Sequence, residues 1–586
     1  MSADSATSIA ETLALHPLLV QLLFLRGITS PGEIRAFLEP DYLTGVHDPF
    51  LFDDMSRAVD RIIQARFGAE RITIYGDYDV DGLSSSALLF DFLSLIGCDV
   101  GTHINHRERD GYGLNATAIH SIIESGTRLI ITTDGGISNA AEIAIAQGRN
   151  VDVIITDHHT VPKDPANIPN AFAILHPLVR ADRYPFKELS GGGVAFKFVQ
   201  ALVKYSGNKE FSDLKTSVRN PDGSPINWEG YEKWLLDLVC LSTIGDCVPL
   251  RGENRIFVKY GLLVLSKTRR IGLQKLLGIS GQMNKKATAR TVGFVIGPRL
   301  NAASRMDHAQ PAFDLLIAVQ EDHAETLAQY LNEKNIERQR LTERITQEAT
   351  ALLADALSLK QCTLVAIGDG WPISVLGLVA GKLCNTHNRP VVLLSAGEGR
   401  IAGAGRSPDS FHLANAFSAL SELFVRHGGH RNAGGFQLAS SVTPLDFAKR
   451  FEEFALLTKV ESSDEVQIAD AQPWDIEVSL FDCDETLLRA IQLLEPFGQN
   501  NPEPILRIRN ACLKDVRCVG VSQRHARVVL EQNGVIKQGI AFSLGNACSR
   551  IPVGTGVDCL VALEENSWNG ISQCQLTIKK ISPCEA

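Results

Sequence analysis

The chain has 586 residues, of which 45% are hydrophobic, and a net charge of −10. This length and apolar content exclude a small single module and predict three or four domains with cores of their own. The negative charge gives no general sign of a nucleic-acid partner, although local basic tracks matter more than the total. We find no charged-then-apolar leader and no apolar run that could span a bilayer, so we expect a cytoplasmic protein without membrane contact.

The twelve cysteines are scattered and form no CxxC pair. This pattern is typical of a reducing cytoplasm and argues against a zinc site. Residues 1–60 are predicted to be helical, with an apolar run at 13–25 and a helix start at 30–33. No chemistry is indicated there.

The stretch 71–86, RITIYGDYDVDGLSSS, contains the first chemical signal. We predict a buried strand, an acidic loop with Asp77, Asp79 and Asp81, and a helix that starts near residues 84–86. Three carboxylates this close repel one another unless a hard divalent ion such as Mg²⁺, Mn²⁺ or Ca²⁺ binds. An EF-hand is excluded because its twelfth position is Leu88 and a strand precedes the loop. The alternative of a solvated turn that contains three aspartates by chance is not excluded by any local feature of the sequence.

Two further apolar strands follow in a βα rhythm. Residues 129–133 end at Asp134 and residues 151–156 end at Asp157, His158 and His159, with helices predicted at 115–125 and 139–147. Alternating strands and helices predict a parallel sheet with right-handed crossovers. Ligands bind beyond the carboxyl ends of such strands.

Each of these three strands therefore ends in residue types that bind metals. One aspartate after a strand is usually a helix cap, but three sets at equivalent positions are hard to explain in that way. Carboxylates mixed with imidazole suit Mn²⁺ or Mg²⁺, and two ions sharing a carboxylate would suit hydrolysis of a phosphate ester. Asp246, which follows the apolar residues 234–241, is a further candidate that is ambiguous by itself.

These motifs resemble a known family. GDYDVDG at 76–82, DGG at 134–136, DHH at 157–159 and GD at 245–246 are similar to the successive motifs of the DHH phosphoesterase superfamily. Within it the chain resembles the bacterial exonucleases specific for single-stranded DNA, over HRERDGYGLN, GPRLNAASRM, LNEKNIERQR, GGHRNAGGF and LEPFGQNNPEP. The resemblance implies a metal-dependent enzyme that degrades single-stranded DNA from the 5′ end, in DNA repair and recombination.

The resemblance also implies a set of site residues. Two divalent ions, Mn²⁺ or Mg²⁺, would be bound by Asp77, Asp79, Asp81, Asp134, His158 and Asp246. Asp134 is the expected bridge between the ions, His159 the expected contact to the scissile phosphate or leaving group, and Asp157 the expected partner that orients His158. Arg107 occupies the position of a family arginine and could bind a phosphate or form an exposed salt bridge.

Arginines and small residues in GPRLNAASR point to phosphate binding by Arg299, Asn301 and Arg305. A glycine run at 191–193, preceded by Ser190, could admit a phosphate to backbone amides or pack the following helix tightly. Residues 314–358 are predicted to form a long connecting helix. After it, the chain resembles the DHHA1 domain, in which Arg406, Ser407, Gly429 and His430 would bind substrate. In GWPISV the family's usual histidine is absent, and Ser374 replaces a glycine.

Five short strands after residue 472 fit an OB-fold that binds single strands. The predicted fold class is α/β, with a parallel-sheet DHH domain, a connecting helix, an α/β DHHA1 domain and an all-β OB-fold. The predicted boundaries are 1–60, 61–313, 314–358, 359–460 and 461–586. A single-stranded-DNA-binding protein and repair helicases are the expected protein partners. Two alternatives remain: a phosphodiesterase for short oligonucleotides or cyclic dinucleotides, and a non-catalytic DNA-binding scaffold.

Overall fold

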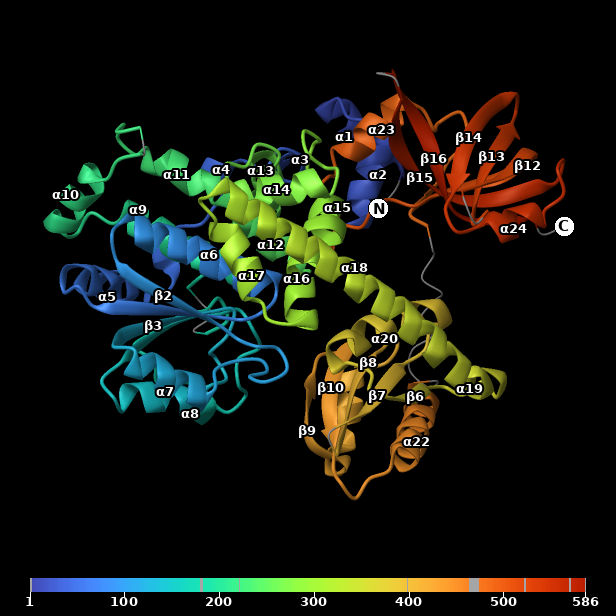
Figure 1. The fold of residues 1–586 in the computed structure, drawn as a ribbon. Coiled ribbons are helices and arrows are strands. Elements are labelled where there is room, and N and C mark those ends of the chain that lie inside the picture. The colour runs from blue at the N-terminus through green and yellow to red at the C-terminus, as the bar shows by residue number, and fades with distance from the viewer. Residues whose placement is uncertain are drawn as a thin grey trace.

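The computed structural model describes residues 3–179, 183–220, 222–397, 399–462, 474–520, 523–568 and 571–584. Its three β-sheets lie in three separate parts of the molecule, and a long helix connects two of them (Figure 1). The predicted fold class is confirmed: a parallel-sheet α/β domain, a connecting helix, a second α/β domain and a C-terminal barrel.

The first sheet has the strand order β2-β1-β3-β4-β5, and every pairing in it is parallel. Its strands are β1 (Arg71–Gly76), β2 (Asp99–Ile104), β3 (Thr127–Thr133), β4 (Asp152–Thr156) and β5 (Ala173–Leu175). Side chains alternate between two buried faces, with Ile74 in one core and Tyr75 in the other. A sheet that is covered on both faces explains why the strands read as continuous apolar runs.

Helices cover both faces of this sheet (Figure 1). One core includes α5 (Met55–Phe67), α6 (Val80–Leu95), α9 (Gly191–Lys204) and α12 (Leu236–Gly245), and the other includes α7 (Ala116–Glu124) and α8 (Ala140–Gln147). The predicted start of α6 near residues 84–86 was wrong. The helix begins at Val80 because the carboxylate of Asp79 caps it, accepting hydrogen bonds from the backbone N–H groups of Asp81 and Gly82.

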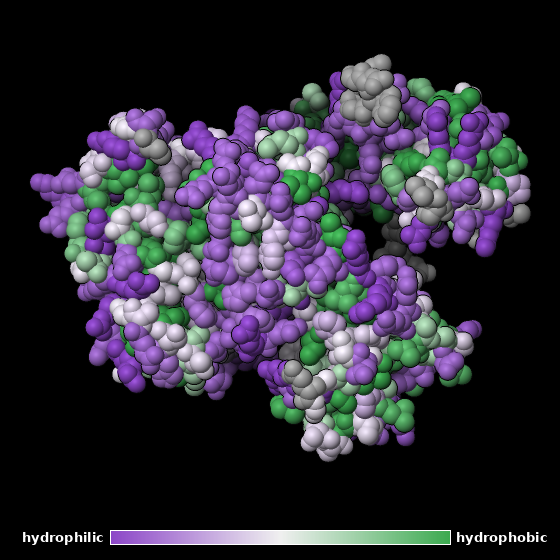
Figure 2. All heavy atoms as spheres, viewed as in Figure 1, coloured by the Kyte–Doolittle hydropathy of each residue, from purple (hydrophilic) through white to green (hydrophobic). Residues whose placement is uncertain are grey.

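The connecting helix α18 (Glu321–Leu352) runs past both α/β domains (Figure 1). It packs on α14 (Ile271–Ile279), α16 (Gly297–Met306) and α17 (Gln310–Ile317), and it also packs on α20 (Ile373–His387) of the second domain. The predicted helix at 314–358 is interrupted between α17 and α18 and again before α19 (Ala354–Ser358). The surface along α18 is mainly hydrophilic (Figure 2), as its charged sequence predicts.

The second sheet has the order β6-β7-β8-β10-β9. Its strands are β6 (Leu364–Asp369), β7 (Val391–Gly397), β8 (Arg400–Arg406), β9 (Phe424–Gly429) and β10 (Ala433–Leu438). Helices α18 and α20 share a core with one face, while α21 (Leu413–Ala419) and α22 (Pro444–Ser462) share a core with the other.

The C-terminal barrel is formed by β12 (Leu506–Val519), β13 (His525–Gln532), β14 (Val535–Ala541), β15 (Gly556–Trp568) and β16 (Ile571–Pro583). Pairing of β12 with β15 closes the ring, and β11 (Ile476–Glu477) adds to β12. The helices α1 (Ala3–Leu13), α2 (Pro17–Leu25) and α3 (Pro31–Leu38) share the core of this barrel together with α23 (Glu485–Gln492). Leu19 and Leu22 of α2, for example, are fully buried there.

A buried arginine attaches this unit to the first domain. Arg255 of α13 (Gly252–Leu265) donates hydrogen bonds to the carbonyl oxygens of Phe37, at 2.7 Å, and Glu495, at 2.9 Å. Within the unit, Arg26 donates to Asn501 Oδ1 at 3.0 Å and so joins the end of α2 to the loop before the barrel. The N-terminal helices and the loop before the barrel are therefore held against α13.

The remaining elements are short: α4 (Tyr42–Gly45), α10 (Lys209–Ser217), α11 (Trp228–Trp234), α15 (Ala289–Thr291), α24 (Gly545–Ser549), the 3₁₀ turns Pro49–Leu51, Pro165–Asn167 and Ser421–Leu423, and a π-helical turn Val292–Ile296. Among the helices in the described ranges, none is long and apolar enough to cross a membrane. All twelve cysteines are free thiols.

Candidate metal centre

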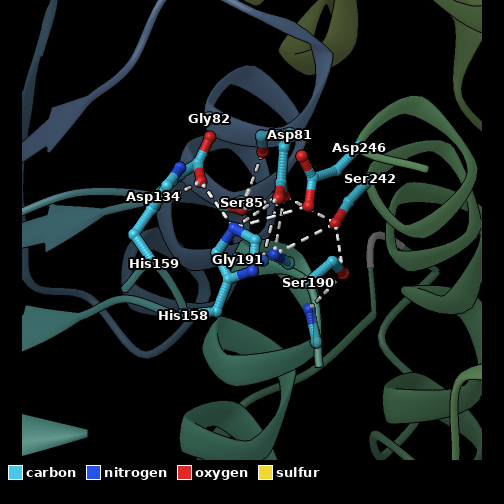
Figure 3. Close-up of polar contacts among 12 residues, drawn as sticks. Asp81, Gly82, Ser85, Asp134, His158, His159, Ser190, Gly191, Ser242 and Asp246 are labelled. Atoms are coloured by element: carbon cyan, nitrogen blue, oxygen red, sulfur yellow. Dashed lines mark hydrogen bonds and ion pairs between the residues drawn. The ribbon is translucent and has the colours of Figure 1, made fainter. Parts of the chain in front are cut away.

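Acidic and imidazole side chains converge beyond the carboxyl ends of β1, β3 and β4. Figure 3 shows the carboxylates of Asp81, Asp134 and Asp246 turned towards the imidazole of His158. His158 Nε2 lies 3.2 Å from Asp134 Oδ1, 3.5 Å from Asp246 Oδ2 and 3.6 Å from Asp81 Oδ2. Asp246 comes from the end of helix α12 rather than from a strand, which is why its sequence context was ambiguous.

The potential ligand atoms fall into overlapping groups. The sets Asp77–Asp79–Asp134, Asp81–His158–Asp246 and Asp134–His158–His159 each have ligand atoms within 4.8 Å of one another. Asp134 belongs to two of these sets, as a bridging carboxylate would. Ligands that share one small divalent cation are about 3 Å apart at metal–ligand distances near 2.1 Å.

The burial and charge of these side chains fit a cation-binding site. Asp77 Oδ1 is buried without a hydrogen-bond partner among the described residues. Burial and neighbouring carboxylates raise the pKa of Asp77 and Asp134 well above the usual range, and they raise the pKa of Asp246 to about 8. Burial lowers the pKa of His158, which favours the neutral imidazole that coordinates metals. Clustered carboxylates with one imidazole therefore fit hard divalent ions such as Mg²⁺ and Mn²⁺.

The carboxylate of Asp81 is oriented by the start of α9. Gly191 N–H donates to Asp81 Oδ2 at 2.8 Å, and Gly192 N–H donates to Oδ1 at 2.9 Å. Ser242 Oγ donates to the same Oδ1 at 2.6 Å. The glycine run was interpreted as a possible phosphate cradle or as a packing device. Its first two amides instead bind Asp81, and a Cβ at Gly192 would lie 2.4 Å from Ser242 Oγ.

The backbone at Asp134 is unusual. Its φ is 60°, in the left-handed region that non-glycine residues seldom adopt. Such conformations concentrate at functional sites, where the surrounding structure holds them in place. Here the Asp134 N–H donates to the carbonyl oxygen of Thr156 at 3.0 Å, which fixes the end of β3 beside the end of β4.

Asp157 orients His159 through the side chain. Its Oδ1 lies 2.8 Å from His159 Nδ1, whereas His158 reaches it through the backbone N–H at 2.7 Å. We predicted that Asp157 orients the His158 ring, but the Asp157 carboxylate instead contacts the His159 ring. Burial opposes both charges, but the hydrogen bond from His159 lowers the pKa of Asp157 and the bond to Asp157 raises the pKa of His159 to about 9.

Three of the arginines predicted to bind substrate, Arg107, Arg305 and Arg406, lie near one another between the two α/β domains. Burial and then the charges of Arg107, Arg338 and Arg406 lower the pKa of Arg305 to about 9, while Asp79 of the acidic loop opposes this shift. Arg107 lies over the ring of Tyr78, 4.0 Å from its centroid, and donates to Ser304 Oγ at 3.3 Å. No carboxylate partner is recorded for Arg107 in the described residues, so the salt-bridge alternative finds no support there.

Other predicted substrate residues have partners inside the protein. Asn301 Oδ1 accepts the Val80 N–H at 3.0 Å and so supports the acidic loop. Ser407 is buried, and its hydroxyl donates to the carbonyl oxygens of Phe411 and Arg431. Gly429 and His430 lie exposed at the turn between β9 and β10. Arg299 contacts Asn332 and the carbonyl oxygen of Val295.

Sequence reasoning missed some contributors. Ser242 has no motif of its own, and only its spacing of four residues before Asp246, one helical turn, could have indicated it. Ser374 and Arg305 were each noted, but their pairing was not. Ser374 Oγ donates to the Arg305 carbonyl at 2.7 Å, and Arg305 Nη1 donates to the Ser374 carbonyl at 2.6 Å. These bonds join the two α/β domains.

A parallel sheet with an aspartate- and histidine-rich edge, followed by a second α/β domain, defines a DHH-type phosphoesterase. Family models agree: the DHH family N-terminal domain matches residues 71–219, the DHHA1 domain matches 360–456 and the RecJ OB domain matches 474–580.

Curated relatives narrow this class. The single-stranded-DNA-specific exonuclease RecJ of Bacillus subtilis (strain 168) is 34% identical over 99% of this chain and 70% of its own length. That of Salmonella typhimurium (strain LT2) is 31% identical over 97% of this chain and 96% of its own. The crystal structure of RecJ with Mn²⁺ from Thermus thermophilus has a TM-score of 0.79 and 27% identity, covering 100% of this chain and 79% of that one. The chain belongs to the RecJ family of single-stranded-DNA-specific exonucleases.

Proposed function

We propose that this chain is a metal-dependent 5′-to-3′ exonuclease that hydrolyses phosphodiester bonds of single-stranded DNA and releases nucleotides, in DNA repair and recombination. The observation that carries the proposal is the position of the metal-ligand cluster beside the arginines Arg107 and Arg305. A phosphodiester needs both: cations at the scissile phosphate and fixed positive charge along the strand. Membership of the RecJ family supports the choice of single-stranded DNA.

Two divalent ions, Mn²⁺ or Mg²⁺, are the proposed cofactors. The proposed ligands are Asp77, Asp79, Asp81, Asp134, His158 and Asp246, with Asp134 between the two ions. When bound, such ions lower the pKa of a water molecule and neutralise charge on the attacking and leaving oxygens. The protein's part is to hold the carboxylates together against their repulsion and to keep His158 neutral.

His159 and Asp157 are the proposed proton-handling pair. Asp157 engages Nδ1 of His159, so only Nε2 is left to face a substrate. The hydrogen bond to Asp157 raises the pKa of His159, which favours the protonated ring. His159 can therefore donate a hydrogen bond or a proton to a phosphate or leaving-group oxygen.

Arg107, Arg305 and Arg406 are proposed to bind phosphate groups of the strand, and Arg299 is proposed to do so farther along α16. Asn301 is proposed to act through the acidic loop that it supports. Gly429 and His430 remain predicted contacts of the second domain, and Ser407 is proposed to shape that domain because its hydroxyl is already engaged.

The chain divisions follow the same proposal: an N-terminal helical segment at 1–60, a DHH catalytic domain at 61–313, a connecting helix at 314–358, a DHHA1 domain at 359–460 and an OB-fold at 461–586. Residues 463–473 of the last unit lie outside the described residues. The barrel is proposed to bind single strands. We propose a single-stranded-DNA-binding protein and repair helicases as partners, and the cytoplasm as the location, because single strands of chromosomal DNA arise there.

The test is digestion of long single-stranded DNA labelled at either end, with Mn²⁺, beside an Asp134→Ala variant. Early release of the 5′ label, with the 3′ label retained on long products, is expected. The variant should be folded and inactive, since it lacks the shared ligand. Release of the 3′ label first would contradict the proposed polarity.

Two other outcomes point to the alternatives. Cleavage of di- to tetranucleotides alone would favour a short-oligonucleotide phosphodiesterase. No hydrolysis of either substrate by the folded, Mn²⁺-loaded protein would favour a non-catalytic scaffold.

A further inference from the structure

A fourth strand of the first sheet also ends in a histidine. His176 follows β5 directly, and its side chain is buried. β5 pairs with β4, and beyond the last pair the N–H of Asp157 donates to the carbonyl oxygen of Leu175 at 3.2 Å. The two chain segments therefore continue side by side past the edge of the sheet, and this brings His176 level with the residues that follow β4.

Both ring nitrogens of His176 have a backbone partner. Nδ1 accepts a hydrogen bond from the Leu178 N–H at 3.0 Å, so the proton of the neutral ring is on Nε2. Nε2 lies 2.8 Å from the carbonyl oxygen of His159 and donates to it. Burial lowers the pKa of His176 to about 4, which favours the neutral ring. The ring is thus a fixed link between the turn after β5 and the loop after β4.

This link completes the hydrogen bonds that hold His159. The His159 N–H donates to Asp157 Oδ1 at 3.1 Å, and Nδ1 of the His159 ring lies 2.8 Å from the same oxygen. Two bonds to a single oxygen leave a residue free to pivot about that atom. The bond from His176 to the His159 carbonyl removes this freedom, because it holds the residue at another point.

We propose that His176 is a positioning residue of the reaction: its Nε2–H holds the His159 carbonyl, so that Nε2 of His159 keeps a fixed direction towards the scissile phosphate. The inference rests on the proposed function, in which His159 donates to a phosphate or leaving-group oxygen. A displacement of about 1 Å in such a group can lower a rate about 100-fold. His176 therefore contributes to kcat through His159, without contact to the substrate.

The chain contains a matched control for this histidine. His16 stands in the same sequence, His-Pro-Leu, and its Nδ1 accepts the Leu18 N–H at 3.2 Å, but this turn begins α2, which belongs to the core of the barrel. An asparagine keeps an acceptor at the position of Nδ1 and has no atom at Nε2, whereas a glutamine keeps a donor near Nε2. His176→Asn and His176→Gln therefore separate the two bonds, and His16→Asn makes the same change elsewhere.

In His176→Asn, kcat on long single-stranded DNA with Mn²⁺ should fall roughly 10- to 100-fold. KM and the affinity for Mn²⁺, measured by calorimetry, should stay at the wild-type values. His176→Gln should recover most of the kcat, and His16→Asn should not lower it. An unchanged kcat in folded His176→Asn, or equal losses in the Asn and Gln variants, would overturn the proposal. A fall in Mn²⁺ affinity that accounts for the lost activity would do the same.

A spectroscopic signal tests His176 independently of activity. In metal-free protein that contains ¹⁵N-labelled histidine, the Nδ1–H signal of His159 is identified by its absence from His159→Ala. It should be present in the wild-type protein and in His176→Gln, and lost through exchange with water in His176→Asn. Its persistence in His176→Asn would contradict the link. If His176→Asn does not fold, His176→Phe takes its place, because it keeps the volume of the ring but has no donor.

The two proposals fail separately. Wild-type protein that shows these spectral differences but hydrolyses no DNA would refute the exonuclease alone. Active wild-type protein with the same kcat and the same His159 signal in His176→Asn would refute the positioning role alone.

Discussion

The carboxylate of Asp81 illustrates how single residues prepare the metal centre. Both of its oxygens accept hydrogen bonds, from the first two amides of α9 and from Ser242. Positive helix ends and hydroxyl donors keep a carboxylate ionised and fix its direction. Asp81 can therefore present a defined lone pair towards His158 before any cation arrives.

Ser242→Ala should weaken binding of Mn²⁺ about 10- to 100-fold, the usual effect of removing a partner that orients a ligand. Titration calorimetry with Mn²⁺ measures this. Ser280→Ala is the control, because the Ser280 hydroxyl bonds only to carbonyl oxygens of its own helix. An affinity unchanged in Ser242→Ala would show that the amides of α9 and the Ser85 hydroxyl are sufficient to orient Asp81.

Metal-free protein should lose stability as pH rises. Burial and the carboxylates of Asp81 and Asp79 raise the pKa of Asp246 to about 8, against about 3.9 for an unfolded aspartate. The folded state then binds more protons than the unfolded state between these values, so the free energy of unfolding falls as pH rises through this window.

Bound Mg²⁺ replaces those protons and removes the repulsion. The rise in Tm caused by Mg²⁺, relative to EDTA, should therefore be larger near pH 8 than near pH 5.5. The increase with pH should be smaller in Asp246→Asn. A metal-induced rise that is equal at both pH values would contradict the repulsion described for this cluster.

At the scale of elements, strand ends could be predicted and helix ends less well. Apolar runs followed by acidic residues identified β1, β3 and β4, because a short apolar run that gives way to polar residues is typical of a buried strand and its end. The start of α6 was missed because Asp79 was taken only as a ligand, although its carboxylate also caps the helix. Pattern reasoning assigns one role to a residue that has two.

Contacts between elements that are distant in the sequence could not be predicted from these patterns. The partner of Asp157 depended on which histidine ring turned back towards it, and this is set by the path of the chain after β4. The amides of Gly191 and Gly192 meet Asp81 only because α9 begins beside α6, more than a hundred positions later in the sequence. Residue types predicted the chemistry of the site, but packing decided which groups face each other.

The contact between α16 and α20 is a small interface with a clear test. Ser374 supplies one of its two hydrogen bonds, from a position where the resemblance leads us to expect glycine. Ser374→Ala should lower stability by about 0.5–1.5 kcal/mol, the usual net value of one hydrogen bond. Thermal unfolding measures it. Ser358→Ala is the control, since the Ser358 hydroxyl bonds within its own exposed turn. Equal Tm values for both variants would mean that the domains dock without Ser374.

At the scale of the whole molecule, the barrel and the N-terminal helices form one body that is attached to the catalytic domain by the buried Arg255. The side chain of Arg255 is almost completely buried, lies 3.7 Å from the centroid of the Phe37 ring and binds the carbonyl of Glu495. No sequence pattern connects residues so far apart, so this attachment could not be predicted from the chain.

Arg255→Met should weaken the attachment by roughly 2–4 kcal/mol, because it leaves buried carbonyl oxygens without donors. Limited proteolysis should then release the barrel faster, and calorimetry should show an earlier first transition. Lys286→Met is the control: it removes an exposed ion pair with Glu495, which is worth less than about 1 kcal/mol. Release at the same rate in both variants would contradict the role of Arg255.

The shared core of α2 and the barrel has a consequence for synthesis. Leu19, Val20, Leu22 and Leu23 leave the ribosome well before residues of the same core such as Leu487 and Leu506. At about 5–20 residues per second, the gap between Leu38 and Ile476 corresponds to roughly 20 to 90 seconds. During that time the apolar faces of α1, α2 and α3 lack the barrel side chains that cover them in the folded protein, so they remain exposed until the barrel has been synthesised.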